Sequence, residues 1–324
     1  MKELLKINNL SVSFLDSKEF CAVRNISFEL FQDEILVIVG ESGSGKSVTA
    51  KQIAGLLPEN ANVCGSIIYD DEDLCKLSDS KMCKIRGKEI SIIFQDSMSG
   101  LNPTMTVEAQ IREAITSHNK ISKKESQEKV IEILRDVNLT PPKSFCHRYS
   151  HELSGGQRQR VMIAMAIACG PKILIADEPT TALDITTQAG IIDLLLELKR
   201  KNRLSVIFIT HDLSVASQLA DRVAVMYAGE IVEIGTKHQV FNKPIHPYTQ
   251  FLVNSQLLWK NERKSLLPTV KGKTPSPSDK IEGCLFAPRC DFAKDICFNE
   301  HPYNNRDSKE HYALCWQCVD KKDL

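Results

Sequence analysis

The stretch ILVIVGESGSGKS, Ile35–Ser47, joins an unbroken apolar run to a glycine-rich loop. A continuous run such as Ile35–Val39 is typical of a strand that is buried on both faces of a parallel sheet. The loop Gly40–Ser47 fits the pattern G-x-x-x-x-G-K-[ST], and helical spacing follows over Ser47–Leu57 and stops at Pro58. Because a strand precedes the loop and a helix follows it, the sequence predicts a phosphate-binding loop.

The residue types in this loop suit phosphate groups. Gly40, Gly43 and Gly45 permit tight turns that point successive backbone N–H groups inward. The N-terminus of the following helix adds about half a positive charge at the same place. We expect Lys46 to reach the β- and γ-phosphates of a nucleotide and the Ser47 hydroxyl to bind Mg²⁺.

Two further segments carry residues that suit nucleotide hydrolysis. ILIADEP, Ile173–Pro179, ends a buried strand with two acids, although a solvated strand end has the same pattern. We expect Asp177 to hold Mg²⁺ through water and Glu178 to orient an attacking water. LSGGQRQR, Leu153–Arg160, indicates a second anion-binding turn. The alternative interpretation is an ordinary helix N-terminus that is capped by Ser154. Two such turns are redundant in one subunit unless the second faces a nucleotide held by a partner.

The other segments of the chain alternate between strand and helix patterns, which predicts an α/β domain. Alternating apolar and polar residues predict antiparallel strands over Leu4–Phe14 and Ile26–Leu30. Further strands are expected at Ile92–Gln95, Ile173–Asp177, Ser205–Thr210 and Glu230–Ile234, and helices at Lys123–Val137, Gln157–Cys169 and Gln188–Lys201.

Composition shifts divide the chain into three parts. We expect an α/β core over residues 1–240, with a helical insertion at about 97–150 that is rich in charge. Residues 241–282 form a connecting segment and a linker, since Lys260–Glu282 is rich in Pro, Ser, Lys and Gly. A small cysteine-rich unit is expected over 283–324.

The overall composition is that of a soluble globular protein. Of 324 residues, 42% are apolar, and 41 Lys and Arg balance 41 Asp and Glu. A nucleic-acid binder would normally show a basic excess, so no nucleic-acid partner is expected. Apolar runs are shorter than the roughly 18 to 20 residues that span a bilayer, and no secretory signal begins the chain. We therefore expect a cytosolic protein that reaches a membrane only by docking onto another subunit.

Eleven cysteines are unevenly distributed. Six are scattered and are expected to be ordinary buried or half-buried thiols: Cys21, Cys64, Cys75, Cys83, Cys146 and Cys169. The other five crowd together near the end: Cys284, Cys290, Cys297, Cys315 and Cys318. In a cytosolic chain such crowding indicates a metal site more than disulfides. The spacing of the first four matches neither zinc ribbons nor ferredoxins, so it leaves zinc, iron–sulfur and unligated thiols open.

Taken together, these motifs resemble the ATP-binding domain of ABC transporters over roughly residues 4–240. The resemblance is carried by GESGSGKS, Gln95 after a strand, LSGGQ, ILIADEP, TALD (Thr181–Asp184) and TH (Thr210–His211), in this order. It implies a P-loop ABC ATPase core, with a mixed sheet, an antiparallel β subdomain and a helical insertion. It also implies hydrolysis of ATP with Mg²⁺ in a head-to-tail dimer that encloses two ATP molecules.

The resemblance assigns roles to individual residues. Glu178, His211 and Gln95 are the implied catalytic set, in which His211 contacts the γ-phosphate and Gln95 couples Mg²⁺ and the attacking water to the insertion. The implied Mg²⁺ set is Ser47, Gln95 and Asp177. The implied nucleotide-binding set is Phe14, Gly40, Glu41, Ser42, Gly43, Ser44, Gly45, Lys46, Ser47, Val48, Ser154, Gly155, Gly156, Gln157 and Asp184.

Within that set, three members are implied to act at particular places. Ser154 and Gly156 cover the ATP of the partner subunit, and Asp184 lies at the dimer seam. Phe14 stacks on adenine, with Phe20 as the alternative, and either residue could equally be a plain core phenylalanine.

Three other segments resemble the oligopeptide/dipeptide branch of importer ATPases, which includes nickel-import relatives. They are FQDSMSGLNPTMTV (Phe94–Val107), HPYTQFLVNS (His246–Ser255) and GCLFAPRC (Gly283–Cys290). The resemblance implies an energy-coupling subunit at the cytoplasmic face of the membrane, with a second ATPase subunit, two permease subunits and, indirectly, an extracytoplasmic peptide-binding protein. Import of nickel or another small solute is the alternative, and a soluble ABC ATPase of DNA repair or translation is a distant one.

The same branch implies a 4Fe–4S cluster on Cys284, Cys290, Cys297 and Cys315, with zinc as the alternative. Cys318 could substitute for Cys315, and the site could be structural or redox-sensing. Arg289, beside Cys290, is expected to be solvated, and the alternative is that it donates hydrogen bonds or offsets thiolate charge.

Overall fold

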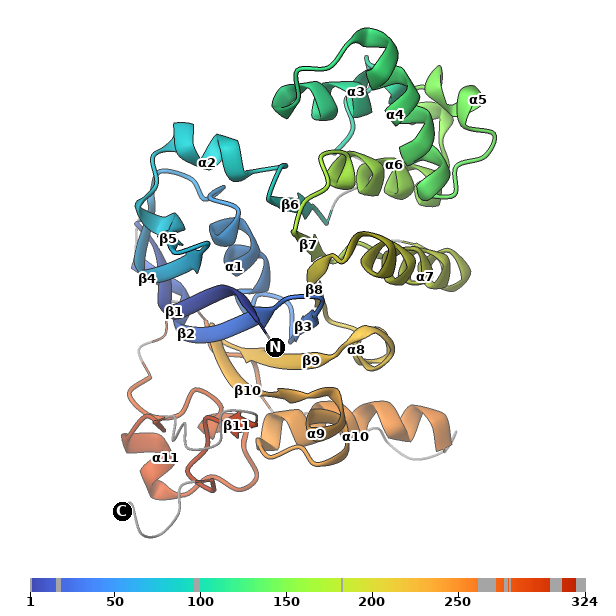
Figure 1. Ribbon diagram of the computed structural model, residues 1–324. Helices are drawn as coiled ribbons and strands as arrows, with labels where there is room; N and C mark the ends of the chain where they lie inside the picture. Colours follow the sequence, from blue (N-terminus) through green and yellow to red (C-terminus); the bar gives the residue numbers. More distant parts are fainter. Residues whose placement is uncertain are drawn as a thin grey trace.

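The computed structural model describes residues 2–15, 19–95, 100–181, 183–261, 272–276, 279, 281–303 and 311–318. Most of the predicted linker, the predicted start of the insertion at residue 97 and the end of the tail lie outside these residues. Two sheets form the centre of the molecule, and Figure 1 shows a group of helices at one end and the C-terminal segment at the other.

The larger sheet has seven strands in the order β11-β10-β9-β3-β8-β7-β6. Its parallel strands are β3 (Ile35–Val39), β6 (Ile90–Ile93), β7 (Ile173–Asp177), β8 (Ser205–Thr210) and β9 (Arg222–Tyr227). Strands β10 (Glu230–Thr236) and β11 (Tyr312–Ala313) extend it in antiparallel sense. All residues of β3, β7 and β8 are buried, as their continuous apolar runs predict.

Two predicted boundaries on the larger sheet and its first helix are wrong. The strand expected at Ile92–Gln95 is β6, which ends at Ile93 because the chain leaves the sheet there and exposes Phe94. The helix expected over Ser47–Leu57 is α1 (Lys46–Ile53), which ends before Gly55 with its positive φ of 63°.

The smaller sheet is antiparallel in the order β2-β1-β4-β5. Its strands are β1 (Glu3–Leu15), β2 (Glu19–Phe31), β4 (Ala61–Tyr69) and β5 (Glu72–Asp73). Leu5 and Ile7 in β1 are buried and alternate with more exposed residues, which is the period-2 pattern of a half-buried strand. The predicted antiparallel strands are confirmed, and the second begins earlier than expected.

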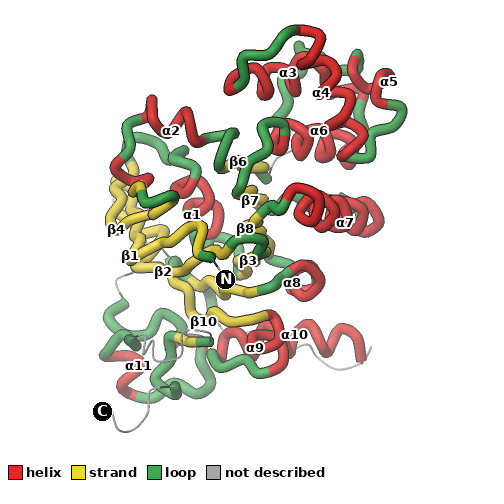
Figure 2. The backbone as a smooth tube through the Cα atoms, viewed as in Figure 1, coloured by secondary structure: helices red, strands yellow, loops and turns green. Residues whose placement is uncertain are grey.

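The helices cover both faces of the larger sheet. Their bounds are α2 (Asp79–Ile85), α3 (Val107–His118), α4 (Lys123–Asp136), α5 (Pro142–Cys146), α6 (Gly155–Ile167), α7 (Ile185–Asn202), α8 (Leu213–Leu219), α9 (Lys237–Asn242), α10 (Pro247–Asn261) and α11 (Asp295–Asn299). Figure 2 shows α6, α7 and α8 along one side of the strands, and α1 and the smaller sheet on the other. The two hydrophobic clusters therefore lie on opposite faces of one sheet.

The C-terminal segment is attached to the sheet of the core. β11 pairs with β10, and Leu285 and Phe286 belong to the same buried cluster as β3 and β8. The division of the chain at residue 283 stays a prediction. Among the residues that the structure describes, no helix is both long enough and apolar enough to cross a membrane.

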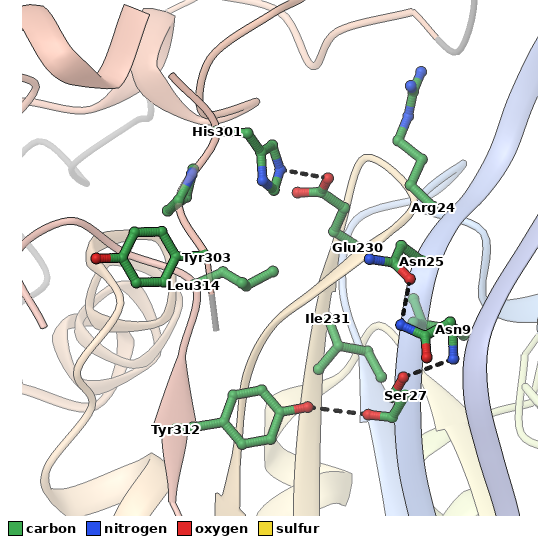
Figure 3. Close-up of a pocket in the computed structure, with 12 residues that line it drawn as sticks. Asn9, Arg24, Asn25, Ser27, Glu230, Ile231, His301, Tyr303, Tyr312 and Leu314 are labelled. Carbon is green, nitrogen blue, oxygen red and sulfur yellow. Dashed lines mark hydrogen bonds and ion pairs between the residues drawn. The ribbon is translucent and has the colours of Figure 1, made fainter. Parts of the chain in front are cut away.

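A cavity of about 380 Å³ lies where the C-terminal segment meets β2 and β10. Figure 3 shows two contacts across it. His301 Nε2 lies 2.7 Å from Glu230 Oε1, and Tyr312 Oη donates to the backbone oxygen of Ser27 at 3.0 Å. Polar contacts thus supplement the strand pairing at this junction.

Candidate nucleotide-binding site

The glycine-rich loop runs from the end of β3 to the start of α1, in the predicted context. Gly45 has φ = 101°, and a Cβ there would lie 2.4 Å from the backbone oxygen of Ala22. A Cβ on Gly40 would lie 2.0 Å from the backbone oxygen of Met226. Both positions therefore require glycine, because the loop passes directly against neighbouring backbone.

The predicted loop residues differ in exposure. Ser44, Gly45 and Lys46 are buried, Glu41, Ser47 and Val48 are half-buried, and Ser42 and Gly43 are exposed. The middle of the loop is therefore exposed to solvent, and the residues that follow it are buried.

Lys46 is buried within the loop that it belongs to. Its Nζ donates to the backbone oxygens of Gly40 at 2.9 Å and Glu41 at 2.8 Å. Burial lowers the pKa of Lys46, while the charges of Glu178, Asp177 and Glu41 oppose that shift. The loop thus holds a buried ammonium close to three carboxylates, whose charges stabilise its protonated form.

Ser47 and Asp177 lie side by side between α1 and β7. Ser47 Oγ donates to Asp177 Oδ1 at 2.9 Å, and burial raises the pKa of Asp177. A hydroxyl beside a buried carboxylate is a set of hard oxygen donors, which is what Mg²⁺ prefers. The residues present therefore fit the predicted magnesium ion.

The other two predicted catalytic side chains, Gln95 and His211, both contact one carboxylate oxygen of Glu178. Its Oε2 accepts from Gln95 Nε2 at 3.1 Å and lies 3.1 Å from His211 Nδ1. Thr181 Oγ1 also donates to Oε2, at 2.9 Å. Glu178 has φ = 46°, uncommon for a residue other than glycine and the kind of backbone outlier that clusters at functional sites. Sequence reasoning predicted Gln95, Glu178 and His211 but missed Thr181.

The second anion-binding turn lies at the start of α6. Ser154 Oγ accepts from the Gln157 N–H at 3.3 Å, and Gln157 Oε1 accepts from the Ser154 N–H at 3.0 Å. This is a complete capping box. Figure 1 shows α6 with α3, α4 and α5, apart from α1. Ser154, the N-cap of α6, is exposed.

Asp184 begins α7 next to this turn. Its carboxylate accepts from the Thr187 N–H at 2.9 Å and Thr187 Oγ1 at 2.7 Å. Hydrogen bonds from Thr186 and Thr187 hold the pKa of Asp184 well below its usual range. A Cβ on Gly156 would lie 2.5 Å from Thr187 Cγ2, so the two predicted seam segments are in direct contact.

The two candidates for adenine stacking lie together on the smaller sheet. Phe14 and Phe20 face one another on β1 and β2, with ring centroids 5.2 Å apart and an interplanar angle of 24°. Both rings are half-buried, so a further ring could stack only on an outer face of the pair.

The four predicted cysteine ligands do meet. Cys284, Cys290, Cys297 and Cys315 line one small pocket with the aromatic residue Phe286. However, no group of three or more His, Cys, Asp or Glu among the described residues is arranged so that it could hold a metal ion. The arrangement therefore does not support the predicted 4Fe–4S cluster or zinc.

The thiols of this pocket differ from one another. Burial raises the pKa of Cys284 to about 12, and a hydrogen bond with Cys318 lowers the pKa of Cys315 to about 7. Cys318 is thus a partner of Cys315.

The prediction that Arg289 is solvated is wrong. Its side chain is only 8% exposed and forms an ion pair with Glu41, Nη1 to Oε2, at 3.1 Å. Nothing in the local sequence could have indicated this contact, because the two residues lie 248 positions apart.

Comparisons with known proteins agree with the motifs and with this geometry. Residues 23–181 match the family described as ABC transporter, and residues 232–297 match the family described as oligopeptide/dipeptide transporter, C-terminal region. The dimeric structure of the ATP-binding cassette MJ0796 bound to ADP and Pi has a TM-score of 0.65 and is 30% identical, covering 72% of this chain and 99% of that one.

Curated relatives are similar over nearly their full length. The dipeptide transport ATP-binding protein DppD of Bacillus subtilis is 47% identical, with 98% of this chain and 95% of the relative covered. DppD of Escherichia coli is 46% identical, with 96% and 97% covered. The oligopeptide transport ATP-binding protein OppD of B. subtilis is 45% identical, with 97% and 88% covered. ABC transporter ATP-binding proteins are ATPases, and this chain belongs to their oligopeptide/dipeptide transporter family.

Proposed function

We propose that this chain hydrolyses ATP at the Gly40–Ser47 loop to power the import of dipeptides or oligopeptides through a membrane permease. The observation that carries the ATPase part is the convergence of Gln95, Thr181 and His211 on Glu178 Oε2. The peptide part is supported by the names of the relatives and by the match of the C-terminal region.

In this proposal the loop and its neighbours bind the nucleotide. The backbone N–H groups of Gly40–Ser47 and the ammonium of Lys46 bind its phosphates, and Phe14 stacks on its base. Ser47, Asp177 and Gln95 would hold Mg²⁺, which when bound offsets negative charge on the phosphates.

Glu178 is the proposed general base. A carboxylate that accepts several hydrogen bonds on one oxygen keeps a single orientation, and its other oxygen stays available to a water molecule. His211, which is exposed, can then turn its ring toward the γ-phosphate. The residues thus supply position and charge, the two contributions on which phosphoryl transfer depends.

The site is completed by a second subunit, either identical or homologous. Ser154, Gly155, Gly156 and Gln157 would cover the ATP held by the partner's loop, and Asp184 would lie at the seam. Ile185, the next residue, is 86% exposed although it is a large apolar residue. In the proposed dimer, Ile185 would lie beside Asp184 at the seam.

The dimer would sit at the cytoplasmic face of the membrane with two permease subunits. An extracytoplasmic peptide-binding protein would deliver the substrate to them. Motion between the closed and open dimer would pass through the helical insertion around residues 97–150 to the permease.

Residues 283–324 are proposed as a cysteine-rich C-terminal unit. Its four thiols at one pocket are what the resemblance associates with a 4Fe–4S cluster, which stays a prediction. Anaerobic purification followed by iron and sulfide analysis should give about four of each per chain if it is present. One zinc per chain, or no metal at all, contradicts it.

Uptake of a labelled dipeptide tests the substrate. The chain is reconstituted with its permease and binding protein in vesicles loaded with ATP. We expect uptake with the wild type and with Arg200→Gln, an exposed control on α7, and loss with Glu178→Gln. ATP-dependent uptake of nickel but not of peptide would contradict the peptide assignment.

A further inference from the structure

Glu41, the second residue of the phosphate-binding loop, contacts three segments that follow residue 240 in the chain. Its N–H donates to Tyr248 Oη in α10 at 3.2 Å. Its carboxylate accepts from Thr274 and from Arg289. The backbone oxygen of the same residue accepts from Lys46 Nζ at 2.8 Å. The residue therefore connects the loop lysine with the C-terminal part of the chain.

The contact between Arg289 and Glu41 has a well-defined geometry. Arg289 Nη1 lies 3.1 Å from Glu41 Oε2 and 3.3 Å from Oε1, and Nη2 lies 3.3 Å from Oε1. Nη1 and Nη2 thus both donate hydrogen bonds to one carboxylate. Such a bidentate pair is stronger and more directional than a single ion pair.

Arg289 also contacts the side chain of Tyr227. Its Nη1 donates to Tyr227 Oη at 3.2 Å, and its guanidinium lies over that ring, 5.7 Å from the centroid. Arg289 ends a short 3₁₀ helix, Ala287–Arg289, and Phe286 just before it packs edge-on against Tyr227 with centroids 5.3 Å apart. The guanidinium is therefore positioned by the buried Tyr227, which in turn packs against Phe286.

The charges explain what this contact could do. The Glu41 carboxylate is one of three anions whose field acts on Lys46. Anionic phosphates would bind at the same loop, so an uncompensated Glu41 would oppose them. Arg289 offsets that charge and keeps the first turn of the loop in place.

We propose that Arg289 is a positioning residue for the phosphate-binding loop, acting through Glu41, so that the C-terminal unit sets the affinity for ATP. This inference rests on the proposed nucleotide site. Arg289 directly precedes Cys290 of the cysteine pocket, so the unit that carries that pocket contributes directly to the loop.

A double-mutant cycle tests the inference. We compare Arg289→Gln, Glu41→Gln, the double variant and the exposed control Arg200→Gln by fluorescence titration with ATP at low salt. Arg289→Gln should raise the Kd for ATP roughly 5- to 30-fold, because it leaves a carboxylate beside the phosphates. The double variant should recover much of that loss, and Arg200→Gln should match the wild type.

Two further readouts separate positioning from general destabilisation. The KM for ATP should rise in Arg289→Gln while kcat changes little, and Arg289→Lys should restore only part of the affinity. If Glu41→Gln fails to rescue Arg289→Gln, or if the Kd of Arg289→Gln equals that of the wild type, the inference is wrong. Lys46→Ala, measured alongside, separates the two proposals, since unchanged ATP binding in that variant would refute the nucleotide site itself.

Discussion

Glu178 depends on its neighbours for orientation, and Thr181 is the neighbour whose contribution can be isolated. Gln95 and His211 are both proposed to contact nucleotide, metal or water, so their replacement changes several interactions at once. The Thr181 hydroxyl donates to Glu178 Oε2, and a substitution of the side chain leaves the second contact, from the Thr181 N–H to the Glu178 backbone oxygen, in place. Thr181 is therefore the cleanest place to test whether the orientation of Glu178 matters.

Thr181→Val keeps the shape of the side chain and removes the donor. We expect kcat for ATP hydrolysis to fall about 2- to 12-fold, the range that corresponds to the net free energy of one hydrogen bond, with the Kd for ATP unchanged. Thr181→Ser should restore turnover. A wild-type kcat in Thr181→Val would show that the bond contributes nothing to catalysis.

Lys46 is the residue-scale test of binding. Its ammonium is buried within the loop, 2.8 Å from the backbone oxygen of Glu41. Lys46→Ala should reduce the affinity for ATP at least tenfold, because it removes the cation at the phosphates. Isothermal titration calorimetry measures the affinity, and Lys51→Ala, an exposed lysine on α1, is the matched control.

Among the secondary-structure elements, the first turn of α6 packs closely against the first turn of α7. A Cβ on Gly156 would lie 2.5 Å from Thr187 Cγ2, whereas one on Gly155 would lie 3.4 Å from Leu183 Cδ2. Thr187 has little freedom to move away, because Asp184 holds both its N–H and its hydroxyl. Adjacent glycines in one turn thus face different steric limits.

Gly156→Ala should therefore destabilise the fold by about 1–3 kcal/mol, the usual cost of overpacking. Gly155→Ala should cost less, since its contact is an ordinary one. Urea denaturation compares the two, and Gly156→Ala combined with Thr187→Ser, which removes the offending methyl group, should regain stability. Equal stability of the two alanine variants would show that α6 and α7 are not in this contact.

At the scale of the whole molecule, the core extends through the C-terminal segment. Phe286 is 4% exposed and packs against Tyr227 of β9 and Tyr248 of α10. Phe298, in the same segment, is 54% exposed. Through Phe286, the C-terminal segment therefore packs against β9 of the larger sheet and against α10.

Phe286→Ala should cost about 3–5 kcal/mol of stability, as expected for a buried phenylalanine. Phe298→Ala, the control, should change stability little. If the urea midpoint of Phe286→Ala stays at the wild-type value, the C-terminal segment does not share the core.

The sequence allowed much of this architecture to be predicted, for identifiable reasons. Strands β3, β7 and β8 could be predicted because their apolar runs are unbroken. Glu178 is indicated by its place directly after the strand Ile173–Asp177, whereas the roles of Gln95 and His211 follow only from the resemblance to ABC transporters. The pairing of β11 with β10 and the contact of Arg289 with Glu41 could not be predicted. Both join positions far apart in the chain, and neither has a periodic or motif signal.

The turnover of Glu178→Gln shows whether Glu178 activates water for ATP hydrolysis. The substitution keeps the shape and much of the hydrogen bonding but removes the base. We predict that this variant binds ATP, forms a stable dimer and loses at least 100-fold in kcat, while the exposed control Glu197→Gln on α7 keeps wild-type turnover. Hydrolysis by Glu178→Gln at the wild-type rate would show that Glu178 is not the general base.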